Sequence, residues 1–165
     1  MMRILVIGAN GQLGSDLIDV LKKNHEVVPV YHSQEFENNV DVTNYKEVEN
    51  LFLEHKPDIV INTSAFHNVD ICEKEPQKAF DVNANAVQNL AELCDKYGII
   101  IAHMSSDYVF DGNKGEAYHE DDLPNPLNVY GKSKLEGENY VRYVKKHFLI
   151  RTSYLFGIKS SSQKK

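Results

Sequence analysis

Short apolar runs along this chain alternate with longer stretches in which apolar side chains recur every three to four residues. The short runs are typical of buried parallel strands, and the longer stretches are typical of amphipathic helices. The pattern predicts strands at residues 3–7, 27–31, 40–44, 58–62, 98–103 and 147–151. It predicts helices at residues 12–24, 76–97 and 128–146, and another that starts at a cap, Thr43 or Asn44, and ends before Pro57. This alternation predicts a parallel, doubly wound α/β sheet in three layers, α/β/α.

One long loop and one polar tail interrupt the alternation. Residues 111–127 carry turn residues and acidic residues, and Pro124 and Pro126 keep them from forming a helix. Loops of this length inside a compact domain usually have a function. Residues 159–165 consist of Ser, Gln and Lys, which is typical of a frayed end. We therefore expect one domain at residues 1–157 and a disordered tail at residues 158–165.

Three glycines, Gly8, Gly11 and Gly14, separate the first strand from the first helix. In such a unit the first glycine allows a tight turn, the second lets backbone approach a pyrophosphate, and the third lets the helix pack on the strand. The helix N-terminus then faces the anion. An ordinary strand-to-helix turn is the alternative, but the position directly after the first strand favours a dinucleotide site. The residues of this turn that we expect to bind a cofactor are Gly8, Asn10, Gly11, Gln12, Leu13 and Gly14.

The residues after the second strand bear on the choice of cofactor. A dinucleotide fold usually has an acidic residue there to bind the ribose, but this chain has His32 and Ser33. These two could instead accommodate a 2′-phosphate, which makes NADPH at least as good a candidate as NADH, or they could form an ordinary polar loop. Asp41 could face the adenine ring or have a structural use. Further cofactor contacts are expected at Val42, at Ser64, Ala65 and Phe66 after the fourth strand, and at Asn83, whose amide could instead bond a loop.

Tyr130 and Lys134 are four residues apart in the last predicted helix and therefore lie on one face of it. An ammonium beside a phenol lowers the tyrosine pKa, so the tyrosine can exchange protons near neutral pH. Ser106, at the end of the fifth strand, could hydrogen bond a substrate carbonyl oxygen. Such a pair is common in helices, but combined with the glycine turn it indicates catalysis. Our candidate catalytic residues are therefore Ser106, Tyr130 and Lys134.

Composition narrows the possible partners. The chain has 165 residues, 42% of them hydrophobic and 25% charged, as expected for one globular domain. The net charge of -6 argues against nucleic-acid or anionic-membrane partners, which need clustered Lys and Arg. Cys72 and Cys94 fall in different predicted helices without metal-ligand spacing, so we expect reduced thiols, no metal site and a cytoplasmic protein. No apolar run approaches membrane-spanning length.

Several motifs together resemble the extended short-chain dehydrogenase/reductase family and, within it, the dTDP-4-dehydrorhamnose reductases. They lie at residues 8–14, 57–62, 69–70 with 73, 82–84, 106–112, 125–134 with 136, and 151–157. The resemblance implies a Rossmann-type fold in which Tyr130 is the proton donor and Lys134 lowers its pKa and binds the ribose. Ser106 stands where the family more often has threonine. The implied reaction is hydride transfer from NADPH or NADH to the 4-keto carbon of a dTDP-linked 4-dehydro-6-deoxysugar, without a metal.

The chain departs from that family in two places. Phe66 and His67 stand where members often have Tyr-Thr. Members also continue past the position of Gly157 into a smaller portion that holds the nucleotide-sugar, for which residues 158–165 are too few. We therefore keep two alternatives to a reductase, namely a non-catalytic dinucleotide-binding regulatory subunit and a nucleotide-sugar epimerase or dehydratase. We also expect apolar surface near the strand ends, which favours a homodimer or association with a separate substrate-binding chain.

Overall fold

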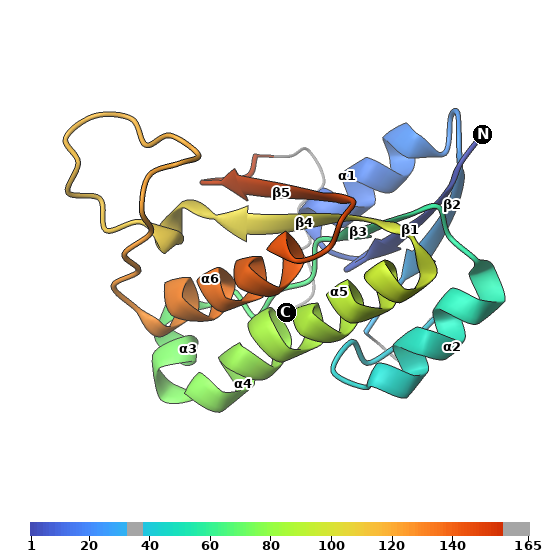
Figure 1. The fold of residues 1–165 in the computed structure, drawn as a ribbon, viewed down its shortest axis with the longest axis horizontal. Coiled ribbons are helices and arrows are strands. Elements are labelled where there is room, and N and C mark those ends of the chain that lie inside the picture. The colour runs from blue at the N-terminus through green and yellow to red at the C-terminus, as the bar shows by residue number, and fades with distance from the viewer. Residues whose placement is uncertain (33–37, 157–165) are drawn as a thin grey trace.

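Five parallel strands form one sheet, in the order β2-β1-β3-β4-β5 (Figure 1). The strands are β1 (Arg3–Ile7), β2 (Glu26–Val30), β3 (Ile59–Asn62), β4 (Ile100–Ser106) and β5 (His147–Thr152). This computed structural model describes residues 1–32 and 38–156, so Ser33 and the predicted tail lie outside the described residues. The order reverses direction between β1 and β3, and open α/β sheets bind ligands outside the carboxyl ends of strands at such a point. The predicted parallel, doubly wound sheet is confirmed.

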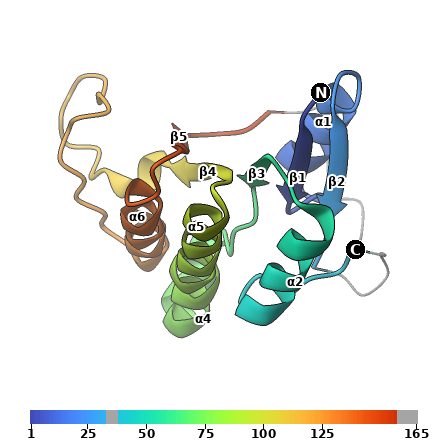
Figure 2. The same ribbon diagram turned by 45° about the vertical axis from the view of Figure 1, so that its right-hand side comes forward.

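Helices lie on both faces of the sheet (Figure 2). α1 (Gln12–Leu21) lies on one face, over β1 and β2. On the other face lie α2 (Tyr45–His55), α5 (Ala86–Tyr97) and α6 (Val129–Arg142). Shorter elements are α3 (Val69–Lys74), α4 (Pro76–Phe80), the π-helical turn η1 (Asp81–Asn85) and the 3-10 turn η2 (Asp107–Val109). Among the described helices, none has the length and apolar character needed to cross a membrane.

The predicted strand at residues 40–44 is wrong. This part of the chain meets the sheet through an isolated bridge between Tyr31 and Asn39 and then leaves it. Val40 and Val42 are nevertheless buried in the core. Their burial explains why the apolar pattern suggested a strand.

Local hydrogen bonds explain why that segment forms a turn. The Asp41 carboxylate accepts hydrogen bonds from the Thr43 N–H (2.9 Å) and hydroxyl (2.7 Å). The Asn44 side chain caps α2 by accepting from two backbone N–H groups, which identifies Asn44 rather than Thr43 as the cap. Such side-chain-to-backbone bonds compete with strand pairing.

The predicted helices are present, but their bounds differ. α1 ends at Leu21 and α6 at Arg142, several residues before the predicted ends at 24 and 146. The predicted helix at residues 76–97 is α4, η1 and α5 in succession. π-Helical turns inside α-helices are rare and occur frequently at functional sites. η1 is therefore a feature that periodicity alone does not reveal.

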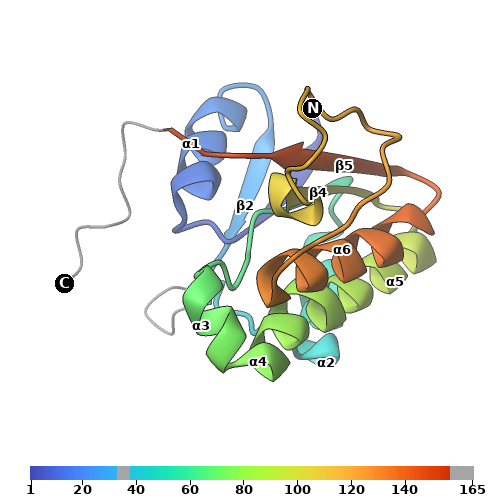
Figure 3. The same ribbon diagram turned by 90° about the vertical axis from the view of Figure 1, so that its left-hand side faces the viewer.

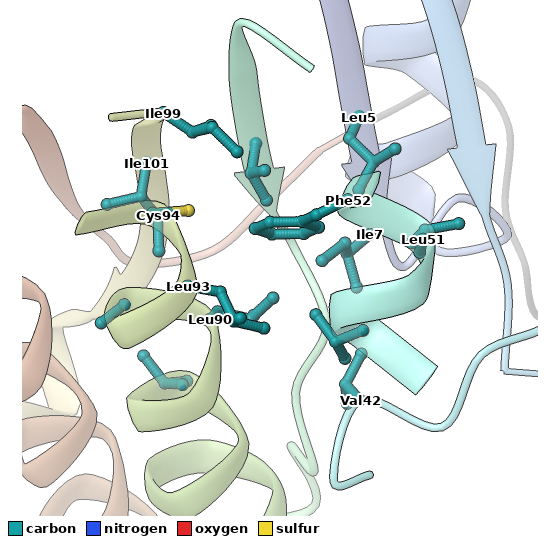
Figure 4. Close-up of a cluster of buried hydrophobic side chains, with 14 of the residues drawn as sticks. Leu5, Ile7, Val42, Leu51, Phe52, Leu90, Leu93, Cys94, Ile99 and Ile101 are labelled. Atoms are coloured by element: carbon teal, nitrogen blue, oxygen red, sulfur yellow. The ribbon is translucent and has the colours of Figure 1, made fainter. Parts of the chain in front are cut away.

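The main apolar core fills the space between the sheet and the helices α2 and α5 (Figure 4). Phe52 of α2 points toward the side chains of α5. The labelled members are Leu5, Ile7, Val42, Leu51, Phe52, Leu90, Leu93, Cys94, Ile99 and Ile101. Burying one such leucine or phenylalanine side chain stabilises the fold by roughly 1.5–3 kcal/mol. This core holds the sheet against the helices, and it thereby fixes the positions of the residues at the carboxyl ends of the strands.

The opposite face of the sheet is covered only in part by the described residues. α1 packs on β1 and β2, and no described helix lies over β4 and β5 on that side (Figure 2). The cross-strand neighbours Ile61, Ala102 and Phe148 lie there, as do Met104 and Ile150; we call these five residues the open sheet face. Phe148 is 61% exposed and Ile150 is 44% exposed. Parallel sheets are normally covered on both faces, so this apolar surface is unusual.

Candidate active site

The glycine turn follows β1 directly, and its shape depends on missing side chains. Gly8 has a φ of +83°, and a Cβ there would lie 2.7 Å from Thr63 Oγ1. A Cβ on Gly14 would overlap the Gly8 carbonyl oxygen. The uses predicted for Gly8, a tight turn, and for Gly14, close helix packing, are therefore confirmed.

Gly11 is the N-cap residue of α1, and no side chain caps this helix. The first turn of α1 also has no acidic residue. An uncapped helix start of this kind binds anions, because its N–H groups lack acceptors and carry partial positive charge. Asn10 is exposed here, and Gln12 and Leu13 are half-buried beside it. The turn therefore has the form that a pyrophosphate requires.

The segment after β5 reaches this same turn. Figure 3 shows it running from β5 toward α1, and Gln12 Nε2 donates a hydrogen bond to the Leu155 carbonyl oxygen at 3.4 Å. The last described residues after β5 therefore lie beside the predicted phosphate site.

Asn62, at the carboxyl end of β3, organises the next loop. Its Oδ1 accepts hydrogen bonds from the Ser64 N–H (3.1 Å) and hydroxyl (2.6 Å), and its Nδ2 lies 3.1 Å from His103 Nδ1. A backbone N–H can only donate, so Oδ1 must face Ser64 and the NH₂ must face His103. His103 therefore accepts at Nδ1 and carries its proton on Nε2. Burial, followed by the charge of Lys134, holds the His103 pKa well below its usual range, so the ring is neutral.

Asn83 holds the loop that contains Ser64, Ala65 and Phe66. It accepts a hydrogen bond from the Phe66 N–H (2.9 Å) and donates to the Phe66 carbonyl (2.9 Å) and to Ser133 Oγ (3.0 Å). Its side chain is fully buried in η1. The amide is thus used to bond a loop, the second of the two uses expected for it. Any effect of Asn83 on a cofactor would pass through the position of Phe66.

Tyr130 and Ser106 come together from two elements. Ser106 ends β4, Tyr130 lies in the first turn of α6, and the Ser106 hydroxyl is close enough to the phenol to act on its pKa. Asn128 caps α6 by accepting from the Gly131 N–H (2.8 Å). A Cβ on Gly131 would overlap the Tyr108 carbonyl oxygen, so α6 packs directly on the segment after β4. The structure therefore places the predicted phenol and hydroxyl close together.

The Ser106 hydroxyl has two further partners. It donates to Asp107 Oδ1 (3.0 Å) and accepts from the Tyr108 N–H (3.2 Å). A substrate carbonyl oxygen would therefore have to compete with Asp107 for the hydroxyl proton.

Lys134 lies one turn after Tyr130 and is almost completely buried. Its Nζ donates to the Met104 carbonyl oxygen at 2.7 Å. Burial lowers the Lys134 pKa to about 8, and the charge of Glu138 acts in the opposite direction. This ammonium thus loses its proton far more readily than an exposed lysine does.

The expected effect of Lys134 on Tyr130 is absent in this arrangement. Burial raises the Tyr130 pKa above its ordinary value, and the hydrogen bond to Ser106 offsets this only in part. Nearby Cys72, Asp107 and Tyr108 raise it further. The reason is that the Lys134 ammonium points to the backbone of β4 instead of to the phenol.

The predicted adenosine contacts lie beyond β2. His32 is exposed, and its charge helps to lower the pKa of Asp41. Burial raises the Asp41 pKa, but the two hydrogen bonds from Thr43, helped by His32, outweigh it and lower the pKa overall. The Val42 side chain lies in the core, which leaves its backbone as the part that a cofactor could contact.

A cleft of about 610 Å³ lies between the segment that follows Ser106, the long loop and the end of β5. It is lined in part by Asp107, Tyr108, Phe110, Tyr118, Arg151 and Thr152. Phe110 and Tyr118 stack with ring centroids 4.2 Å apart, which joins the long loop to the end of β4. The predicted functional loop therefore forms one wall of a cleft beside the candidate catalytic residues.

Sequence reasoning missed a buried ion pair behind this site. Glu138 has no exposed surface and binds Arg151 through two hydrogen bonds, of 2.9 and 2.6 Å. Arg151 lies 4.9 Å from the centre of the Phe110 ring and donates to the Glu120 carbonyl oxygen at 3.4 Å. The sequence does place Glu138 four residues after Lys134, and therefore on the same face of the helix, which could have indicated a charged contact there.

Comparisons with known proteins agree with this geometry. The family model described as "RmlD substrate binding domain" matches residues 2–164. A probable low-salt glycan biosynthesis reductase of Haloferax volcanii is 42% identical, and the match covers 98% of this chain and 56% of that protein. A dTDP-4-dehydrorhamnose reductase of Aggregatibacter actinomycetemcomitans is 41% identical, over 95% of this chain and 53% of that protein.

A solved structure of a reductase is similar to this chain in both fold and sequence. The dTDP-4-dehydrorhamnose reductase of Bacillus anthracis, in complex with NADP, superposes with a TM-score of 0.90 at 35% identity, covering 96% of this chain and 56% of that chain. The chain spans about half the length of the curated relatives it matches.

The sheet order and the glycine turn define a Rossmann-type fold of the class found in sugar-nucleotide reductases. The resemblance to extended short-chain dehydrogenase/reductases is thereby confirmed. Within this class, the chain belongs to the RmlD substrate binding domain family.

Proposed function

We propose that this chain forms the dinucleotide-binding part of an NAD(P)H-dependent reductase that reduces the 4-keto group of a dTDP-linked 4-dehydro-6-deoxysugar. The observation that carries the proposal is the meeting of Ser106, Tyr130 and Lys134 at the end of β4, at the same edge of the sheet as the glycine turn. The names of the relatives support the substrate, and the NADP in the Bacillus anthracis structure supports the cofactor.

The residues present fit a dinucleotide. The turn from Gly8 to Gly14 would hold the pyrophosphate at the start of α1, where no side chain caps the helix and Gly11 would let the backbone approach the phosphates. His32 follows β2 at the place where an acidic residue would select the ribose of NADH, and its imidazole suits a 2′-phosphate. We infer that NADPH is bound, with NADH as the alternative.

Side chains of this chain would then control the proton. The bound cofactor supplies the hydride. Tyr130 donates its hydroxyl proton to the substrate carbonyl oxygen, and Ser106 hydrogen bonds the same oxygen after releasing Asp107. Lys134 would bind the ribose hydroxyls by turning from the Met104 carbonyl, and its charge would then lower the Tyr130 pKa.

We also propose that a further polypeptide packs on the open sheet face. The described helices leave Phe148 and Ile150 exposed there, and the relatives are almost twice as long as this chain. A separate substrate-binding chain would complete the cleft, whereas a homodimer would cover the face without supplying a nucleotide-sugar site. Light scattering distinguishes the two, because a homodimer forms from the purified chain alone.

A cytoplasmic location is part of the same proposal. Cys72 and Cys94 are both free and buried, as expected for a protein from a reducing compartment.

The second candidate is a non-catalytic dinucleotide-binding regulatory subunit. Two observations favour it: the raised Tyr130 pKa, and the engagement of Lys134 with the Met104 carbonyl. It predicts tight cofactor binding that Tyr130→Phe leaves unchanged, and a partner protein that is recovered by pull-down. A third candidate is a nucleotide-sugar epimerase or dehydratase. The similar solved structures of that kind are under 25% identical to this chain and support only the fold.

The test is oxidation of NADPH with dTDP-4-dehydrorhamnose, by the chain alone and with the carboxyl-terminal half of a full-length relative added. We expect turnover in at least the second mixture and none with Tyr130→Phe. Tight NADPH binding without turnover in either mixture would leave the regulatory subunit as the better proposal.

A further inference from the structure

Glu138 lies on the face of α6 that carries Lys134, and it has no exposed surface. Its Oε1 accepts hydrogen bonds from Ser105 Oγ (2.6 Å) and Arg151 Nε (2.9 Å). Its Oε2 accepts from Arg151 Nη2 at 2.6 Å. A buried carboxylate is tolerated only when it is paired and hydrogen bonded in this way. The site therefore contains a fixed negative charge that the proposed reaction does not use.

Glu138 and Lys134 bind adjacent residues of β4. Lys134 Nζ donates to the Met104 carbonyl oxygen, and Glu138 accepts from the Ser105 hydroxyl. The next residue of the strand is Ser106, which contacts Tyr130. The pair consequently fixes α6 against the part of β4 where the candidate catalytic groups meet.

The charge on Lys134 depends on few neighbours. The titratable groups near the pair are His103 of β4, Tyr130 and Arg142 of α6, and Arg151 of β5; Cys72 of α3 acts on Tyr130. His103 is neutral, the Tyr130 pKa is raised, and the Arg151 guanidinium is bound to Glu138. Burial favours the uncharged amine of Lys134, and Glu138 is the described group that opposes this.

We propose that Glu138 is a positioning residue that keeps Lys134 protonated at the pH where a dinucleotide ribose is bound. The inference rests on the role given to Lys134 in the proposed function. Glu138 touches no reacting atom and acts through Lys134.

The first test measures the titration of Lys134 directly, by NMR of the isotope-labelled chain without cofactor. The signal is assigned by its loss in Lys134→Arg. We expect a midpoint near pH 8 in the unmodified chain and a midpoint lower by about one pH unit in Glu138→Gln. Glu136→Gln removes a carboxylate from the same helix and should leave the midpoint unchanged. Equal midpoints in Glu138→Gln and the unmodified chain would overturn the inference.

The second test measures NADPH affinity against pH by calorimetry. A fall of about one unit in the Lys134 midpoint predicts up to tenfold weaker binding above the new midpoint, with recovery at about pH 6. A purely structural role would weaken binding equally at every pH, which would overturn the inference. If the unmodified chain binds no NADPH although the midpoint shifts as expected, the proposed function fails and the coupling of Glu138 to Lys134 stands.

A third measurement covers the case in which Glu138→Gln does not fold. In the unmodified chain, the carboxylate ¹³C shift of Glu138 should change at the midpoint of Lys134. Ser105→Ala keeps the charge of Glu138 and should preserve that midpoint. A Glu138 signal that does not respond when Lys134 titrates would overturn the inference.

Discussion

The glycine turn and the corner formed by α6 and the end of β4 are two parts of one candidate site, and they are built in opposite ways. The turn is made of backbone, its residues are neighbours in sequence, and it works because Gly8 and Gly14 lack side chains. The corner is made of buried polar side chains that come from η1, β4, α6 and β5. Added atoms therefore disturb the turn, whereas the corner responds to changes in its buried polar and charged groups.

Adding one methyl group to the turn should have the largest effect. In Gly14→Ala the Cβ overlaps the Gly8 carbonyl oxygen, and the backbone has to move. We expect a loss of about 3 kcal/mol or more in the free energy of unfolding, measured by urea denaturation.

Gly11→Ala is the matched control for that change. Gly11 has a φ of -71°, and its Cβ would lie 3.2 Å from the Gly8 carbonyl oxygen. We expect stability to change by under about 1 kcal/mol while NADPH binding weakens, because the added Cβ would hinder the approach of the backbone to the phosphates. Equal destabilisation by the two changes would contradict the separate uses of the two glycines.

Removing one hydroxyl from the corner should affect turnover more than stability. Tyr130→Phe should reduce turnover by about 100-fold or more, equivalent to about 2.7 kcal/mol, because it removes the proton donor. Dinucleotide affinity and the melting temperature should change little. The assay pairs the variant chain with the same partner half that gives turnover with the unmodified chain.

Removing the Asn83 amide should destabilise the corner, because this side chain bonds the Phe66 backbone and Ser133 of α6. Asn83→Ala leaves the half-buried N–H of Phe66 without its partner, and leaves the Phe66 carbonyl with only the Cys72 thiol. We expect a loss of about 2 kcal/mol in the free energy of unfolding. Asn85→Ala, an exposed asparagine two residues away that bonds Asp81, serves as the control and should cost under about 0.5 kcal/mol. Similar losses for both would mean that the bonds to Phe66 contribute little.

Replacing the buried ammonium should stabilise the corner. The folded pKa of Lys134, about 8, lies below its ordinary value of 10.5, so burial of the charge destabilises the fold below pH 8. This penalty fades as pH rises from 8 to 10.5, because the unfolded state then binds more protons. Lys134→Met should therefore raise the free energy of unfolding at pH 7 by about 1 kcal/mol or more.

The pH dependence provides the check on that variant. The difference between Lys134→Met and the unmodified chain should shrink between pH 8 and pH 10.5. Using the difference removes the effect of Cys94, whose buried thiol has a pKa raised to about 12 in both proteins. A difference that stays constant over this range would show that Lys134 is not a buried charge.

The turn could be predicted from the sequence because its three glycines follow one another within residues 8–14, although Gly8 also packs against Thr63. The strands and the longer helices followed from periodicity, except at residues 40–44, where hydrogen bonds to Asp41 and the cap Asn44 prevail over two buried valines. The short helix α3 and the π-helical turn η1 were not predicted.

The partners within the corner could not be predicted in the same way. Whether Lys134 points to Tyr130 or to the Met104 carbonyl depends on how closely α6 approaches β4, which no local pattern records. The pairing of Glu138 with Arg151 likewise depends on β5 lying beside β4. Buried polar contacts between distant elements are a property of packing.

The glycines of α6 have a consequence for the stability of the helix itself. Gly131 and Gly137 let the helix approach the carbonyl oxygens of Tyr108 and Asn83, but each glycine lowers the intrinsic stability of a helix by about 1 kcal/mol. A helix of this length with two glycines would be mostly unfolded as an isolated peptide. The helical form of α6 therefore depends on its packing against η1 and the end of β4. The spacing that brings Tyr130 and Lys134 to one face is thus maintained by the tertiary structure and not by the helix alone.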